Sequence, residues 1–211
     1  MKKITVNLSI SLIALIFIGC WAKKTPSQDI SIHAEATAKI MESEPDWYKN
    51  CYNMPEYKLF LIGKGEAASR DKLLSRKRAI NALVNDLQRK KDVIAKGRAD
   101  DFTEEQGTNA SSKIIAKFES VEQSVWEGAV QDWAELNSET VIEPSVDANN
   151  QPYNIYRTYT IGGLDLNKAH KSLMAELEND QELLIAFKKN KSDEKLLEEL
   201  VRYKDHFQKN Y

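Results

Sequence analysis

The sequence has few of the residues that define several common protein classes. Its 211 residues include only two cysteines, eight glycines and five prolines. Two cysteines exclude a disulfide framework, and the low glycine and proline counts exclude collagen-like or low-complexity chains. The formal net charge of -2 excludes the strongly basic surface of a general nucleic-acid binder. The length fits one compact domain.

Short catalytic and metal-binding motifs are also missing from the sequence. The three histidines, His33, His170 and His206, lie far apart, and no His-Glu-x-x-His or Cys-x-x-Cys spacing occurs. No serine lies in a Gly-x-Ser-x-Gly motif. We therefore expect a chain that is not an enzyme and that holds neither a metal nor a cofactor.

One long apolar run is present, close to the start of the chain. Residues 8–18 follow a basic start at Lys2 and Lys3. This run is too short to cross a membrane, which takes about 20 helical residues. A short apolar segment after a basic start is typical of a secretory signal. We therefore predict that residues 1–19 are a signal peptide.

The apolar run ends in Phe17-Ile18-Gly19-Cys20. This end resembles the lipobox of bacterial lipoproteins, although that motif prefers leucine where Phe17 stands. The resemblance implies cleavage before Cys20, diacylation of its sulfur and acylation of the new amino group. Two or more acyl chains hold a protein stably at a membrane, whereas one binds only marginally. A plain secretory signal and an uncleaved N-terminal anchor are the alternatives.

Residue 21 indicates a destination for such a lipoprotein. It is tryptophan, whereas aspartate at this position tends to hold enterobacterial lipoproteins at the inner membrane. By that analogy we expect the chain at the outer membrane of a bacterial envelope. Residues 20–44 would then be the lipidated cysteine and a tether, with a short helix from His33, and residues 45–211 a single domain with a C-terminal helical extension.

Cys51 would be the only unmodified cysteine of the mature chain. It has no partner for a disulfide within the chain, although the expected compartment is oxidising. We interpret it as a small buried side chain, since free cysteine packs like a small apolar residue. A disulfide between chains and a reactive thiol are the alternatives.

Apolar spacing in residues 45–211 predicts an α+β fold rather than an alternating βαβ fold. The clearest strand, rich in aromatic and β-branched residues, covers residues 153–161. The turn residues that precede it predict an antiparallel hairpin. In chain order we expect a strand (57–68), helices (70–96 and from about 111), the hairpin (129–143 with 153–161) and further helices from residue 165 onward.

Particular residues mark the expected ends of these elements. Gly97 is placed to stop the long helix, and residues 103–106 match a capping box for the next one. Asp165 is the expected N-cap of the helix after the hairpin, residues 179–180 break that helix, and Ser192 caps the last. The prediction is thus a small antiparallel sheet of about three strands, packed against several helices.

Two pairs of residues are weak candidates for a binding site. Gly63 and Gly65 lie between the first strand and the long helix, where phosphate-binding loops occur, but the segment matches no phosphate-loop or dinucleotide motif. We expect a turn, a bulge or a close backbone approach there, with phosphate binding as the alternative. Trp47 and Trp133, together with Trp126, could stack a small ligand or glycan, whereas packing in the core is the competing interpretation.

The order of these features resembles that of the LPP20-type bacterial lipoproteins. The resemblance covers residues 45–175, and its motifs are the lipobox, Pro45-Asp46-Trp47, Gly63-Lys64-Gly65-Glu66-Ala67, Ala79 with Ala82, and Tyr153-Asn154-Ile155-Tyr156-Arg157. It implies a small α+β domain on an outer-membrane or surface lipoprotein, with relatives linked to flagellar motor-associated structures, motility and exposed antigens. Only the acylated Cys20 carries over as a functional residue.

The sequence therefore favours a membrane-anchored envelope lipoprotein without catalytic activity. Its expected partners are the membrane, through Cys20, and other envelope proteins or further copies of itself, with no nucleic acid. The alternative is a periplasmic or surface module that binds a small ligand or a glycan.

Overall fold

The computed structural model describes residues 44–107, 111–188 and 193–210. All of the described elements belong to one unit, Glu44–Tyr211. The acylation candidate Cys20, the expected helix from His33 and the expected cap Ser192 lie outside the described residues.

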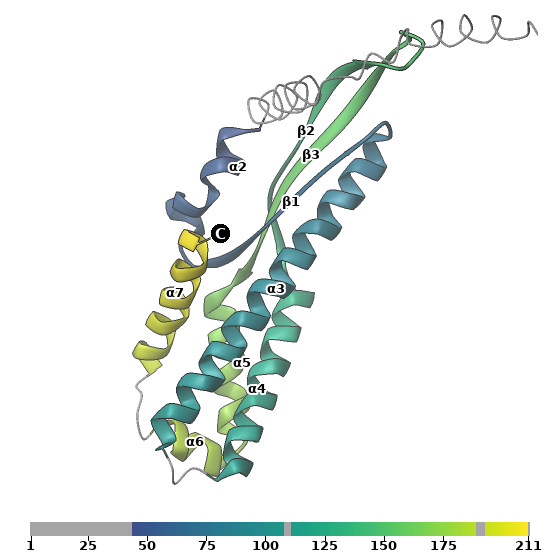
Figure 1. Ribbon diagram of the computed structural model, residues 1–211. Helices are drawn as coiled ribbons and strands as arrows, with labels where there is room; N and C mark the ends of the chain where they lie inside the picture. The colour runs from purple at the N-terminus through teal and green to yellow at the C-terminus, as the bar shows by residue number, and fades with distance from the viewer. Residues whose placement is uncertain (1–43, 108–110, 189–192, 211) are drawn as a thin grey trace, which may run out of the picture. The chain divides into compact units, whose positions relative to one another are not determined.

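The elements follow the predicted order of strand, helices, hairpin and helices (Figure 1). They are the helix α2 (Asp46–Asn50), the 3-10 helices η1 (Cys51–Asn53) and η2 (Pro55–Tyr57), β1 (Phe60–Ser69), α3 (Lys72–Gln106), α4 (Ser112–Gln131), β2 (Ala134–Val146), β3 (Pro152–Asp165), α5 (Leu166–Glu178), α6 (Gln181–Lys188) and α7 (Asp193–Asn210). The fold is α+β with a three-stranded antiparallel sheet, which confirms the predicted class.

The sheet has the strand order β1-β3-β2. The central strand β3 pairs antiparallel with both neighbours, and β2 carries a bulge between Glu135 and Asn137. β1 ends where Ser69 pairs with Tyr156, whereas β2 and β3 continue pairing as far as the tip. The end of the hairpin is therefore a two-stranded ribbon that extends past β1 (Figure 1).

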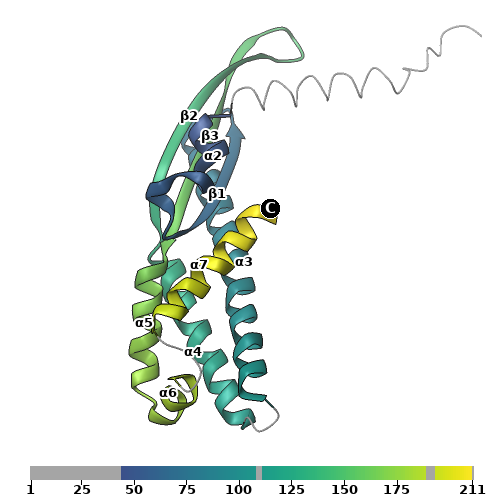
Figure 2. The same ribbon diagram turned by 90° about the vertical axis from the view of Figure 1, so that its left-hand side faces the viewer.

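Different elements cover the two faces of the sheet. α3 runs along one face, and a large hydrophobic cluster joins that face to α4, α5, α6 and α7. On the opposite face lie α2 and the two 3-10 helices (Figure 2), where Tyr48 and Cys51 pack on Ile62, Tyr159 and Ile161. This alternation follows from the period of two along β3, which sends successive side chains to opposite faces.

The long helix does not stop at Gly97, so that prediction is wrong. α3 continues to Gln106, and Gly107, with a φ of 68°, follows it. Residues 103–106 are the last turn of α3 rather than a capping box, and the hydroxyl of Thr103 donates to the carbonyl of Ala99. A glycine inside a helix costs about 1 kcal/mol relative to alanine. Here the ring of Tyr203 from α7 fills the space that Gly97 leaves.

The other predicted boundaries are correct or shifted by a few residues. β1 begins at Phe60 rather than at residue 57, because Pro55–Tyr57 forms a 3-10 helix. The hairpin strand β2 begins at Ala134 rather than at residue 129, because α4 continues to Gln131 and buries Val130. Asp165 does cap α5, where its carboxylate accepts from two backbone N–H groups, and residues 179–180 do separate α5 from α6.

Candidate functional site

The structure contradicts both the phosphate-loop alternative and the turn expected at Gly63 and Gly65. Both glycines lie within β1, and this strand packs directly on α3. A Cβ at Gly65 would lie 2.0 Å from the carbonyl oxygen of Ala79, and one at Gly63 would lie 2.5 Å from Cγ of Leu87. The backbone of α3 and its leucines thus fill the space that a phosphate would need. The expected close backbone approach is the correct interpretation.

The structure does not bring the candidate tryptophans together. Trp47 on α2 packs on the same face of the sheet as Tyr48, and its indole donates to the carboxylate of Glu139 at 3.0 Å. Trp133 belongs to the cluster on the other face, against Gly162. Trp126 is buried and cannot stack an external ligand. The three side chains therefore form no common binding surface.

A buried lysine, which no pattern in the sequence predicts, connects several elements on the aromatic face of the domain. Nζ of Lys90 on α3 donates to the carboxylate of Asp86 at 2.6 Å, the hydroxyl of Tyr52 at 3.0 Å and the carbonyl oxygen of Ile62 at 2.8 Å. All three ammonium protons therefore have acceptors. The backbone N–H of Lys64 also donates to the carboxylate of Asp86. We call Lys90, Asp86, Tyr52 and Lys64 the Lys90 cluster.

Asp86 holds this cluster to the sheet. Burial opposes ionisation of Asp86, but hydrogen bonds from Lys90, the backbone N–H of Lys64 and Arg89 outweigh it and hold the pKa of the carboxyl below its usual value. Burial raises the pKa of the Tyr52 hydroxyl, which therefore stays protonated. These hydrogen bonds join α3 to β1 and η1, so they hold the first elements of the domain on the long helix.

Lys64 and Cys51 complete the same face. The ammonium of Lys64 lies 4.1 Å from the ring centre of Tyr48, in the geometry of a cation–π contact. Cys51 is free and fully buried, which confirms the interpretation of a packed small side chain. Burial also raises the pKa of its thiol, more than the nearby lysines lower it. A buried, protonated thiol is suited to packing rather than to nucleophilic chemistry.

A second ionic contact lies inside the helical part of the domain. Arg98 of α3 pairs with Glu122 of α4 at 3.1 Å, and both side chains are almost fully buried. The other carboxylate oxygen of Glu122 accepts from the indole of Trp126 at 2.9 Å. A buried pair of this kind adds little net stability, because the cost of removing two charges from water offsets their attraction. We assign it a structural role.

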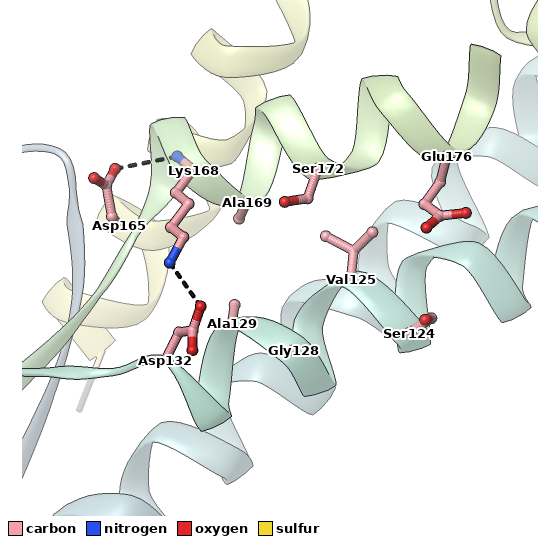
Figure 3. A pocket seen from close by; sticks show the side chains of 10 residues that line it. All are labelled: Ser124, Val125, Gly128, Ala129, Asp132, Asp165, Lys168, Ala169, Ser172 and Glu176. Carbon is pink, nitrogen blue, oxygen red and sulfur yellow. Dashed lines mark hydrogen bonds and ion pairs between the residues drawn. The ribbon is translucent and has the colours of Figure 1, made fainter. Parts of the chain in front are cut away.

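A narrow groove runs between α4 and α5 (Figure 3). Its volume is about 220 Å³. The groove stays open because the facing side chains are too small to fill the space between the two helices. These small residues are Ser124, Gly128, Ala129, Ala169 and Ser172. At one end Nζ of Lys168 reaches across from α5 to Asp132, the residue that follows α4, at 2.6 Å.

The carboxylates of this groove do not form a metal site. Asp165 caps α5, and Asp132 pairs with Lys168. Within residues 44–107, 111–188 and 193–210, no group of three or more histidine, cysteine, aspartate or glutamate side chains is placed to hold a metal ion.

The end of the β2–β3 hairpin presents apolar side chains to solvent. Ile142 is 56% exposed and Val146 is 60% exposed. They lie four residues apart on one strand, so they share a face of the ribbon. In the described part of the chain β2 is also an edge strand, with a neighbour on one side only. Exposed apolar residues on an edge strand are typical of a surface that binds another chain.

A scan of protein-family models, a search of curated proteins and a search of solved structures find no match for this chain. The similarity to LPP20-type lipoproteins therefore stays a prediction that depends on the motifs quoted above. Among the described helices, none has both the length and the apolar character that a bilayer crossing requires.

Proposed function

We propose that this chain is a bacterial envelope lipoprotein, anchored at the outer membrane by acyl chains on Cys20. Its α+β domain would act without catalysis, by assembling with other envelope proteins or with further copies of itself. The observation that carries the proposal is the lipobox-like sequence Phe17-Ile18-Gly19-Cys20 at the end of the apolar run. Acylation there would tie the domain to a bilayer.

The exposed end of the hairpin supports an assembly role. Ile142 and Val146 present apolar area on a ribbon that extends past β1 (Figure 1). Tyr48 of α2 covers the face of the sheet formed by Ile62, Tyr159 and Ile161. The projecting ribbon is therefore the part of the sheet that we expect to meet a partner. A partner strand could also add to the edge of β2.

Cell fractionation tests the anchor. The Cys20→Ala variant is expected to leave the membrane fraction, because it loses the acylated sulfur. The Cys51→Ala variant is the matched control, since Cys51 is buried in the domain, and it is expected to stay with the membrane. Equal membrane recovery of both variants would refute the anchor.

Photo-crosslinking in intact cells tests the assembly surface. A benzophenone amino acid at position 146 is expected to give discrete crosslinked species, whose masses identify a second copy or another envelope protein. The same amino acid at position 185 on α6 is the control, because Ile185 is equally open to solvent (68% exposed) but lies away from the hairpin. Identical crosslinks from both positions, or none from position 146, would contradict the assembly role.

The resemblance to LPP20-type lipoproteins would place the partners among motility structures. A deletion strain is then expected to swim less far in soft agar. The wild-type gene should restore swimming, and the Cys20→Ala gene should not. Normal swimming of the deletion strain would remove motility from the proposal and leave the anchor untouched.

The groove between α4 and α5 is the feature that favours the alternative, a module that binds a small ligand or glycan. The Ser172→Trp variant would fill the groove, and Lys171→Trp, at an exposed neighbouring position, is its control. Envelope glycan fragments titrated by calorimetry should bind the wild type and the control but not Ser172→Trp. The absence of binding to the wild type would leave the assembly role as the single proposal.

A further inference from the structure

The first two turns of α3 form a basic and apolar surface. Residues 70–78 hold five basic residues against one acidic residue, in a chain whose overall net charge is -2. Leu73, at 79% exposed, is the most exposed large apolar residue of the described chain, and Leu74 is 40% exposed. We call this surface, residues 70–78, the α3 corner.

The contacts of Ser75 turn the leucines outward. The hydroxyl of Ser75 lies 2.8 Å from the carbonyl oxygen of Ala67 and 2.9 Å from the hydroxyl of Thr158, so this side of the helix faces the sheet. Leu73 precedes Ser75 by two positions, about 200° around the helix, and therefore points away from the sheet. In Figure 1 the start of α3 extends past the end of α4, which agrees with the 79% exposure of Leu73.

Some cations of the α3 corner contact other side chains of the domain, and others form no ion pair in the described chain. Arg76 pairs with Glu135 at 3.1 Å, and the guanidinium of Arg70 lies over the ring of Tyr153. The carboxylate of Asp71 accepts from the backbone N–H of Leu74 and is used as the N-cap of α3. Three further cations are exposed and have no ion pair with any described residue, namely Lys72, Lys77 and Arg78.

We propose that the α3 corner binds the surface of an anionic lipid bilayer, with Leu73 inserted among the headgroups and Lys72 and Lys77 on lipid phosphates. Lysine and arginine beside exposed leucine are the residues that attach proteins to anionic membranes. Protein interfaces, in contrast, are depleted in lysine. The inference rests on the proposed anchor, since a lipid on the same chain would keep the bilayer at high effective concentration. Contact at the corner would fix the orientation of the domain on the membrane.

A fluorescent probe at position 73 tests this contact. The full chain with Leu73→Cys carries an environment-sensitive fluorophore and is reconstituted into vesicles of phosphatidylcholine alone or mixed with phosphatidylglycerol. Cys51 is buried, and Cys20 would be acylated, so the new thiol is the one that should react. We expect a blue shift and quenching by a lipid-borne quencher on the mixed vesicles. Both effects should be lost at high salt, which screens exposed charges.

Two comparisons make the test specific. The same fluorophore on Ile185→Cys, an exposed apolar site on α6, should show no shift. Adding Lys72→Glu and Lys77→Glu to the Leu73→Cys chain should remove the shift, with circular dichroism confirming that the domain remains folded. If the protein floats with the vesicles but the probe at position 73 stays in water, the lipid contact is refuted and the anchor is kept. Binding of an acidic protein to the α3 corner in cells would not rescue the lipid contact. Protein that fails to float would overturn both.

Discussion

At the scale of single residues, Gly63 and Gly65 are explained by the space that they leave for α3. The Gly-x-Gly spacing before a helix predicted a turn, a bulge or a close backbone approach and left phosphate binding as the alternative, because spacing alone cannot distinguish a loop from a strand packed against a helix. The distances decide the question, because Cβ atoms at these positions would meet Ala79 and Leu87. The glycines set how closely β1 and α3 pack.

The Gly65→Ala variant is expected to lower the free energy of unfolding by about 2 kcal/mol or more, because the new methyl group overpacks a backbone contact. Gly128→Ala is the control, since a Cβ at Gly128 meets nothing within 4 Å on α4. That control should raise stability by about 0.5–1 kcal/mol, as alanine is the better helix former. Urea denaturation of both variants measures the difference, and an equal change in both would refute the packing argument.

The carboxyl of Asp86 predicts a pH dependence of stability. Its folded pKa lies below the unfolded value near 3.9, so its contribution is fully present above about pH 4 and is lost as the pH falls through the folded pKa. The Asp86→Asn variant should lose about 2–3 kcal/mol at neutral pH, because it leaves Lys90 buried without its carboxylate.

Denaturation at several pH values checks this prediction. As the pH falls from about 4 through the folded pKa of Asp86, the wild type and Asp86→Asn should converge in stability. The matched control is Asp100→Asn, at an exposed position on the same helix with no ion pair to any described residue, and it should follow the wild type throughout. A constant gap between Asp86→Asn and the wild type from neutral to acidic pH would contradict the assigned role.

At the scale of elements, local patterns predicted what local interactions determine. The period of two in residues 153–161 found β3, and the short side chain of Asp165 identified the start of α5. The end of α3 was missed because it depends on α7, more than a hundred positions later, whose Tyr203 packs on Gly97. The Lys90 cluster was missed for the same reason, since Tyr52 and Lys90 are separated by 38 positions. Periodicity carries no information about which distant polar groups meet.

The attachment of α7 gives a prediction at this scale. The hydroxyl of Tyr203 donates to the carboxylate of Asp101, and burial raises the pKa of this phenol, so it stays protonated. The Tyr203→Phe variant loses that hydrogen bond, worth about 1.5–3 kcal/mol because the acceptor is charged. Hydrogen exchange should become faster in α7 and stay unchanged in the sheet. Unchanged exchange in α7 would show that this contact does not hold the helix.

At the scale of the whole molecule, the proposals concern three surfaces, and two of them, the α3 corner and the end of the hairpin, meet where Arg70 lies over Tyr153. The lipid on Cys20 would attach the chain, the α3 corner would orient the domain, and the end of the hairpin would meet a partner. The described structure accounts for why these surfaces are available, since Leu73 and Val146 are exposed while the aromatic face is covered by α2. The tests above address each surface with a different variant, so that each can fail alone.

The mass of the N-terminal peptide tests the central claim most directly. The protein is extracted in detergent from bacterial cells that express the full chain, and the peptide is analysed by mass spectrometry. We expect a chain that begins at Cys20 and carries acyl chains on its sulfur and amino group. A chain that still begins at Met1, or one that begins elsewhere with a free thiol at Cys20, would contradict it.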